Sequence, residues 1–393
     1  MRLLIVSHVM HYHGSAGYSA YTPYAREIEI WANLFPEVVI AAPCSEQAPP
    51  GDTCLIARQN VRVIPQKEVG GTSLSAKLGI VLALPNLIWN LCREMWKADA
   101  IHVRCPGNLG LLGAVFAPLF SKRLIAKYAG QWTGFPGEEW TVRLQRAVLR
   151  SPWWRGPVTV YGKPEGQPER VINFFSSMFT AEQLAQAQQS AQNKIWRTPM
   201  TVAFAGRLSP SKNVDILLEA IAAASQQGVE LRATIMGDGP EREKLHGLAQ
   251  KLGITKSVEF TGAVSPERVA HELAQAEVFV LTSNTEGWPK AIAEAMAFGL
   301  ICVGSDLGLI RTFLAEGRGF TVPPRDAGAL CDRLIQIANS GPGERQAMSE
   351  KAATWAQGYS LDSLQTALAG VMRQWWRLPA PPTPPQAPVQ EAQ

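Results

Sequence analysis

The sequence predicts two α/β domains in series, each built on a doubly wound parallel sheet, with a ligand cleft between the carboxyl ends of the two sheets. Three observations lead to this fold class. The 393 residues are enough for two domains of ordinary size, and the hydrophobic share of 46 % suits globular packing. Short apolar strands alternate with helices, first from Leu3 and again from Thr201. In the second series, polar or glycine-bearing turns follow several strands, as expected where strand ends line a cleft.

Residues 1–180 are expected to form the first, Rossmann-like domain. Buried strands are predicted at residues 3–7, 38–42, 61–65, 100–103, 124–127, 158–161 and 170–174. Residues 8–21 have the composition of a polar, glycine-containing loop. Helices are predicted at residues 22–33, 78–96, 107–120 and 138–150, the second of them broken near Pro85. The Gln- and Ala-rich residues 181–198 are interpreted as the interdomain connection.

Residues 199–357 are expected to form the second domain. Strands are predicted at residues 201–205, 231–236, 257–260, 277–281, 301–303 and 319–322. Helices are predicted at residues 214–227, 241–251, 327–339 and 344–356, with two more that begin at Ser265-Pro266 and near Trp288-Pro289. A last helix lies in residues 358–378, and the proline-rich residues 379–393 are expected to be a disordered tail.

Composition excludes several functional classes. The formal charge of +4 is too weak by itself to indicate a nucleic-acid partner. The six cysteines show no CxxC pair and are expected to be reduced thiols in a cytoplasmic protein. The first residues resemble a strand more than a signal peptide, and the longest apolar runs are shorter than the ~20 residues that span a bilayer. The sequence therefore favours a protein that is soluble or peripheral to a membrane.

The stretch from residue 281 to residue 304 predicts a strand, a tight turn, a helix and a second strand. Glu286 and Glu294 lie eight residues apart, about 12 Å along a helix at ~1.5 Å per residue, and on roughly one side of it. Each carboxylate can accept hydrogen bonds from hydroxyl groups, and the helix N-terminus between them can bind an anion. Two hydroxyl-bearing rings that flank a diphosphate, as in a nucleotide sugar, would match this pattern.

A second constellation follows the strand at 201–205. Arg207 can contact phosphate with two hydrogen bonds, and Lys212 adds a point charge. Such a pair can hold a diphosphate and neutralise it as it leaves. The alternative is that both are solvated residues of a surface loop. Both residues lie between a predicted strand and a predicted helix, and this position favours a role in lining a cleft. The same position is shared by Gly237-Asp238-Gly239 and by Glu286-Gly287.

The second half of the chain resembles the glycosyltransferase family 4 (group 1) enzymes, which have the GT-B fold of two facing Rossmann-like domains. The resemblance is carried by AGRLSPSKNVDILLEAI (205–221), MGDGPEREKL (236–245), VEFTGAVSPERV (258–269) and the E-x7-E pair within EGWPKAIAEAMAFG. These motifs follow one another in order between residues 205 and 299. The first domain matches only loosely, through a first strand, a glycine-containing loop and IHVR before a helix.

The resemblance implies retaining transfer of a sugar from a nucleotide-sugar donor, with no obligatory metal and no protein nucleophile. The implied catalytic residues are Arg207, Lys212 and Glu286. Glu294 would bind the ribose, and the other implied donor-binding residues are Gly206, Gly237, Asp238, Gly239, Val264, Gly287, Trp288, Pro289 and Lys290. The first domain would bind a glycan or lipid-linked acceptor, with His8, Gly14 and Gly17 in its cleft. The last helix would return across that domain.

Three departures from the family pattern concern the acceptor side and the sugar pocket. The segment 305–308 lacks the second glycine and the glutamate that members commonly have there. Residues 129–131 stand where many members carry a histidine, and Gly14 and Gly17 are separated where an adjacent pair is common. His11 and His13 have no carboxylate or cysteine neighbour that would suggest a metal site, so none is expected.

The first domain also contains tryptophans beside basic residues, at 88–96 and at 138–155. This composition suits an anionic membrane interface, whereas the alternative is a crossover helix with its apolar face on the sheet. The sequence leaves other functions open as well. One is another GT-B enzyme such as an epimerase, and the other is a non-catalytic partner that binds a nucleotide sugar. The role favoured by the resemblance is assembly of a surface polysaccharide or another glycoconjugate.

Overall fold

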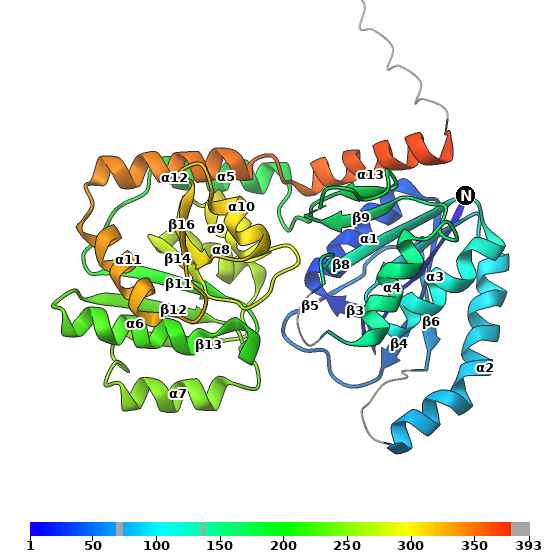
Figure 1. The fold of residues 1–393 in the computed structure, drawn as a ribbon, viewed down its shortest axis with the longest axis horizontal. Helices are drawn as coiled ribbons and strands as arrows, with labels where there is room; N and C mark the ends of the chain where they lie inside the picture. The colour runs from blue at the N-terminus through cyan, green and yellow to red at the C-terminus, as the bar shows by residue number, and fades with distance from the viewer. Residues whose placement is uncertain (68–73, 135–137, 163, 379–393) are drawn as a thin grey trace, which may run out of the picture.

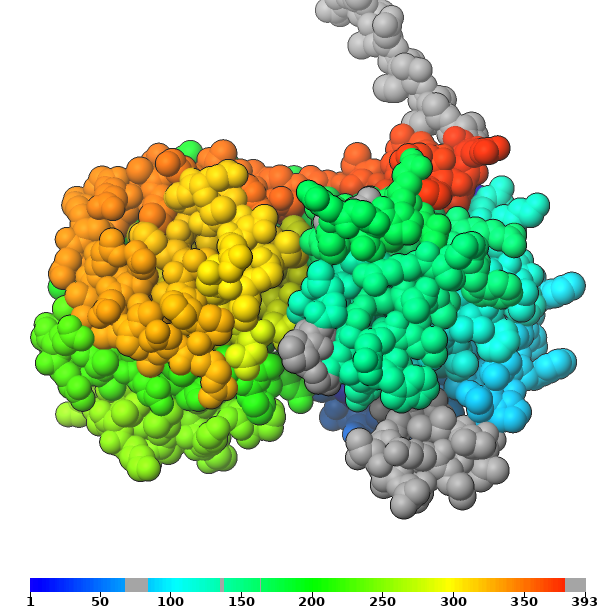
Figure 2. Space-filling model, in the orientation of Figure 1, coloured from blue at the N-terminus to red at the C-terminus, as the bar shows by residue number. Residues whose placement is uncertain are grey.

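The computed structural model describes residues 1–67, 74–134, 138–162 and 164–378, which form two α/β lobes side by side (Figure 1). The predicted tail at 379–393 lies outside the described residues. Helices α12 (Pro342–Ala356) and α13 (Leu361–Trp376) run along one side of the molecule, α12 over the C-terminal lobe and α13 over the N-terminal lobe. The space-filling view shows the two lobes in contact beneath these helices (Figure 2).

The N-terminal sheet has the order β10-β9-β8-β7-β1-β4-β2-β3-β5, with β6 paired to β4. Its strands are β1 (Arg2–Val6), β2 (His11–Gly14), β3 (Gly17–Tyr21), β4 (Glu37–Ser45), β5 (Thr53–Leu55), β6 (Val61–Gln66), β7 (Ala100–Cys105), β8 (Leu124–Gln131), β9 (Val158–Tyr161) and β10 (Val171–Asn173). The strands that carry the core are parallel, so their carboxyl ends meet at one edge. Each predicted strand of this domain is present.

Residues 8–21 are not the loop that their composition predicts. They form an antiparallel hairpin of β2 and β3, in which Gly14 pairs with Gly17 and His11 pairs with Ala20. Gly17 has a φ of 120°, which glycine adopts without strain and other residues rarely do. His11 and Ala20 are fully buried, so the hairpin is held by its contact with the domain core, which a polar composition does not reveal.

The helices of the first domain are α1 (Thr22–Leu34), α2 (Leu74–Trp96), α3 (Asn108–Phe120) and α4 (Trp140–Arg150). The predicted break near Pro85 is wrong, because α2 continues through this residue. A proline inside a helix removes one backbone hydrogen bond. Here the following turns stay attached to the domain because Leu87, Leu91 and Met95 are buried in its core.

The C-terminal sheet is parallel throughout, in the order β13-β12-β11-β14-β15-β16. Its strands are β11 (Met200–Ala205), β12 (Leu231–Met236), β13 (Val258–Gly262), β14 (Val278–Leu281), β15 (Ile301–Ser305) and β16 (Gly319–Val322). The helices are α6 (Val214–Gln226), α7 (Arg242–Lys251), α8 (Pro266–Gln275), α9 (Lys290–Ala297), α10 (Gly308–Leu314) and α11 (Ala327–Asn339). Ser265 caps α8 as expected, since its side chain accepts a hydrogen bond from the backbone N–H of Arg268.

Two helices tie the lobes together. The segment interpreted as the interdomain connection contains α5 (Ala181–Gln192), which begins with a capping box between Thr180 and Gln183. Its small apolar face packs into the core of the C-terminal domain. In the other direction, α13 packs into the N-terminal core, and the Trp376 indole donates a hydrogen bond of 3.1 Å to the carbonyl of Leu124. The chain therefore crosses between the lobes twice.

Candidate active site

A cleft of about 820 Å³ lies between the two domains at the carboxyl ends of their sheets. Ten of the residues that the sequence indicates line it: Gly206, Arg207, Lys212, Val264, Glu286, Gly287, Trp288, Pro289, Lys290 and Glu294. They come from the loops after β11, β13 and β14 and from the start of α9. Parallel strands bring these loops to one edge although the sequence separates them by up to 88 positions, from Gly206 to Glu294.

The central polar contact of the cleft joins Lys212 and Glu286. The Lys212 ammonium donates a hydrogen bond of 2.5 Å to Glu286 Oε1. Both side chains are partly accessible, with exposed fractions of 23 % and 13 %. Arg207 lines the same wall, is exposed, and has no ion-pair partner among the residues that the structure describes. The wall thus offers one arginine fork, one paired ammonium and one carboxylate to a ligand.

Asn213, which is not among the site residues that the sequence motifs indicate, holds this pair in place. Its backbone is left-handed, with a φ of 47°. Its buried side chain donates hydrogen bonds to the carbonyl of Thr282 at 2.8 Å and to Asn284 Oδ1 at 2.7 Å. The loop that carries Lys212 is therefore locked to the loop that carries Glu286. The sequence does contain a pattern that points to this conformation, because an asparagine directly before a helix suits a left-handed backbone.

Gly237, Asp238 and Gly239 lie behind the cleft wall and are absent from its described lining. A Cβ built on Gly237 would lie 1.9 Å from the carbonyl oxygen of Gly206, and one on Gly239 would lie 2.3 Å from that of Leu208. The Asp238 carboxylate accepts from the backbone N–H of Gly239 and from Arg242. This turn supports the loop that carries Arg207, because only glycine permits so close a backbone approach. Contact of the turn with a donor stays a prediction.

Helix α9 brings Lys290 and Glu294 into the cleft. Burial raises the pKa of Glu294 to about 7, and the nearby charges of Lys290 and Arg26 limit the rise. Burial, together with the like charges of Lys127 and Arg104, lowers the pKa of Lys290 to about 8. The Lys290 ammonium also lies 5.8 Å from the centre of the Tyr21 ring. Near neutral pH, Glu294 is therefore only partly ionised and is able to donate as well as accept a hydrogen bond.

His8, Gly14 and Gly17 do not belong to the described lining of the cleft. Gly14 and Gly17 close the hairpin of β2 and β3. His8 packs instead against Gly107, where a built Cβ would lie 2.5 Å from His8 Cγ. The N-terminal wall is formed by other residues, among them Tyr21, Arg104 and Tyr161. Arg104 lies near the carboxyl end of β7, and Arg207 lies just after the carboxyl end of β11.

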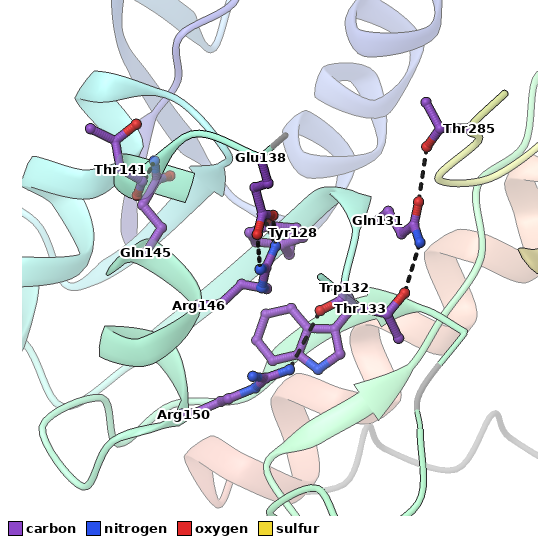
Figure 3. A network of polar contacts seen from close by, with 10 residues as sticks. All are labelled: Tyr128, Gln131, Trp132, Thr133, Glu138, Thr141, Gln145, Arg146, Arg150 and Thr285. Carbon is purple, nitrogen blue, oxygen red and sulfur yellow. Dashed lines mark hydrogen bonds and ion pairs between the residues drawn. The ribbon is translucent and has the colours of Figure 1, made fainter. Parts of the chain in front are cut away.

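Gln131, near the position of the family's histidine, bridges the two domains (Figure 3). Thr285, next to Glu286, donates a hydrogen bond of 2.9 Å to Gln131 Oε1, and Gln131 Nε2 donates to Thr133. The surrounding network holds this end of β8 against α4: Arg146 pairs with Glu138 and donates to the Tyr128 hydroxyl, and Arg150 donates to the Trp132 carbonyl. The loop of Glu286 is thereby anchored on both sides of the cleft.

Within the described residues, no group of three or more His, Cys, Asp or Glu side chains could hold a metal ion. None of the described helices is both long and apolar enough to cross a membrane.

Part of the chain is similar to known sugar-transferring enzymes. Residues 185–355 match the family model described as glycosyl transferases group 1. The alpha-D-kanosaminyltransferase of Streptomyces kanamyceticus is 30 % identical over 175 residues, which are 44 % of this chain and 45 % of that protein. The putative colanic acid biosynthesis glycosyltransferase WcaL of Escherichia coli is 32 % identical over 39 % of this chain and 40 % of its own length. The chain thus spans about half the length, or less, of these relatives.

Solved structures match over nearly the whole chain. Anabaena HepE in complex with UDP and glucose aligns with a TM-score of 0.71 at 17 % identity, covering 95 % of this chain and 99 % of that one. The sucrose-phosphate synthase of Thermosynechococcus elongatus aligns with a TM-score of 0.72 at 18 % identity, covering 96 % and 99 %. At this identity the likeness shows the fold, which is GT-B as the sequence motifs imply.

Proposed function

Because residues 185–355 belong to the glycosyl transferases group 1 family and the whole chain has the GT-B fold, we propose that the protein is a retaining glycosyltransferase. It moves a sugar from a nucleotide-sugar donor to a glycan or lipid-linked acceptor. The observation that carries this proposal is the Lys212–Glu286 pair with Arg207 on the same cleft wall, where Arg207 has no ion-pair partner among the described residues. Cations for a diphosphate and a carboxylate for sugar hydroxyls stand together in one cleft.

The donor is proposed to lie along the C-terminal wall. Arg207 and Lys212 hold its diphosphate, and the backbone N–H groups at the start of α9 contribute positive partial charge. Glu286, in the loop before α9, faces the hydroxyls of the sugar, and Glu294, about one turn inside α9, faces the ribose. Relatives support a nucleotide of this kind, since HepE has been solved with UDP and with UDP-glucose. Val264 lies beside the base.

The transfer step needs no protein nucleophile and, on this proposal, no obligatory metal. The acceptor hydroxyl oxygen forms a bond to the anomeric carbon while the bond from that carbon to the β-phosphate oxygen breaks. The proton of the acceptor hydroxyl passes to the leaving phosphate on the same face of the sugar, which retains the configuration. Arg207 and Lys212 stabilise the negative charge that grows on the phosphate. The product is a surface polysaccharide or another glycoconjugate, as the name of the WcaL relative suggests.

Nucleotide-sugar binding tests the proposal directly. We expect one or a few members of a panel of UDP-, GDP- and ADP-sugars to raise the melting temperature of the full chain, because a ligand that binds only the folded state stabilises it by about 2.7 kcal/mol at 100 times its Kd. Release of the nucleoside diphosphate in the presence of a cell-envelope lipid extract would then report transfer. A protein that binds a donor without turnover would favour a non-catalytic partner, and one that interconverts free donors would favour an epimerase.

We further propose that the enzyme works in the cytoplasm, at the inner face of the membrane, and that helices α2, α3 and α4 contact the lipid. These helices pack side by side on the N-terminal lobe (Figure 1). Large apolar side chains point outward from this surface: Trp89 is 71 % exposed, Trp96 82 % and Trp140 67 %. Exposed basic residues accompany them, including Arg93, Lys97, Lys122, Arg123 and Arg143. Aromatic side chains beside cations suit an anionic interface.

Co-sedimentation with vesicles checks the membrane contact. We expect the full chain to pellet with vesicles that contain anionic phospholipid at low salt, and less so at high salt. The Trp89→Ser/Trp96→Ser variant should bind at least about tenfold more weakly, since burial of even one large apolar side chain is worth about 1.5–3 kcal/mol. Ile195→Ser is the matched control, because Ile195 is 62 % exposed and lies away from these helices. A wild-type chain that stays in the supernatant would contradict the proposal.

A further inference from the structure

The N-terminal wall of the cleft contains a charge cluster of Glu27, Arg104 and Lys127, none of which belongs to the proposed donor site. Glu27 is 4 % exposed and accepts two hydrogen bonds through Oε2, one from Arg104 Nη1 at 2.9 Å and one from Lys127 Nζ at 2.8 Å. Burial disfavours the carboxylate, but the charges of Lys127 and Arg104 outweigh it and lower the pKa of Glu27 below its usual range. A single carboxylate is therefore shared by two cations.

Glu27 neutralises the charge of only one of the two cations, and no neighbouring group fully neutralises the charge of the other. Burial lowers the pKa of the adjacent His102 to about 3, so this imidazole is neutral at physiological pH. Lys290 faces the cluster from the C-terminal domain, and its ammonium has no hydrogen-bond partner in the described part of the chain. Glu294 offsets this charge only in part, since its pKa is about 7. Three cations thus stand around one fully ionised carboxylate.

Arg104 is the member of the cluster that a ligand can reach. It lines the cleft, and its side chain is 12 % exposed. Its Nε is buried and has no hydrogen-bond partner among the described residues, although the guanidinium is a planar fork with five N–H donors. Lys127 lies behind it, with an exposed fraction of 5 %. An unsatisfied, buried donor at a cleft wall costs free energy unless a ligand completes its hydrogen bonds.

We propose that this wall binds a phosphate group carried by the acceptor, and that Arg104 contacts it. The proposal rests on the proposed glycosyltransferase function and names the class of acceptor. The donor diphosphate has its own cations, Arg207 and Lys212, which project from the opposite domain. A phosphate monoester has a charge of about −1.5 to −2, which matches the excess positive charge of the cluster better than a carboxylate does. Tyr21 and Tyr161 flank the position and also line the cleft.

Titration of inorganic phosphate into the full chain, with and without saturating UDP, tests this site. We expect the wild type to bind phosphate whether or not UDP is present. Arg104→Gln should weaken phosphate binding by at least about tenfold, since hydrogen bonds to charged groups are stronger than those between neutral groups. The phosphate affinity of Arg104→Lys should lie between those of the wild type and Arg104→Gln. Arg207→Gln should weaken UDP binding and leave phosphate binding of the UDP-loaded protein as in the wild type.

Two results would overturn the inference. One is equal phosphate affinity for the wild type and Arg104→Gln, with both chains folded by circular dichroism and melting temperature. The other is displacement of phosphate by UDP, which would assign these cations to the donor diphosphate. Failure of the proposed function looks different: UDP and nucleotide sugars would then fail to bind the wild type, while phosphate binding would still depend on Arg104.

Discussion

Replacement of Glu286 by glutamine is expected to lower kcat for sugar transfer by about 100-fold or more, which corresponds to about 2.7 kcal/mol of transition-state stabilisation. The amide keeps the shape of the side chain but removes the charge that lies 2.5 Å from the Lys212 ammonium. The carboxylate orients the sugar hydroxyls on this proposal, so its loss disturbs the position of the anomeric carbon. The Kd for UDP should stay within about threefold or become tighter, because Lys212 is freed for the diphosphate.

The measurement is steady-state transfer with the donor found by the melting-temperature screen, together with UDP binding by calorimetry. Glu259→Gln is the matched control. Glu259 is an exposed residue of β13 that lies outside the described lining of the cleft. The kcat of the Glu259→Gln variant should therefore equal that of the wild type. If Glu286→Gln retained kcat within about threefold of the wild type, the assignment of this carboxylate to the sugar would be wrong.

Gly237→Ala is expected to lower the melting temperature of the C-terminal domain by about 6–12 °C. The new Cβ would lie 1.9 Å from the carbonyl oxygen of Gly206, and the φ of 139° is one that alanine rarely adopts. Steric conflict and backbone strain together cost about 3 kcal/mol, and each kcal/mol lowers Tm by about 2–4 °C in a domain of this size. The affinity for UDP should also fall, because relief of the conflict displaces the loop that carries Arg207.

Thermal unfolding followed by calorimetry checks this result, and Gly247→Ala supplies the control. Gly247 lies inside α7, and a Cβ built there meets nothing within 4 Å. Alanine is a better helix former, so this substitution should raise the stability by about 0.5–1 kcal/mol. Equal melting temperatures for Gly237→Ala and the wild type would show that the loop that carries Arg207 can move without loss of stability. The turn at Gly237 would then not support that loop.

The sequence alone determined the strands of the C-terminal domain, most of its helices and which of their loops meet, although it did not indicate the short helix α10. The motifs there are local and their apolar spacing is regular, so strand, turn and helix follow from short-range preferences. Because parallel strands place all their carboxyl ends at one edge, the sequence predicts Arg207, Lys212 and Glu286 in one cleft, and all three line it.

Only the tertiary structure decided the remaining features, for one physical reason. Contacts between segments far apart in the chain depend on register and crossover, which a local pattern does not contain. The hairpin of β2 and β3 is held by burial of His11 and Ala20. The support from Gly237 exists because two loops touch backbone to backbone. Arg104 meets Lys127 through Glu27 only because β7, β8 and α1 are neighbours in space.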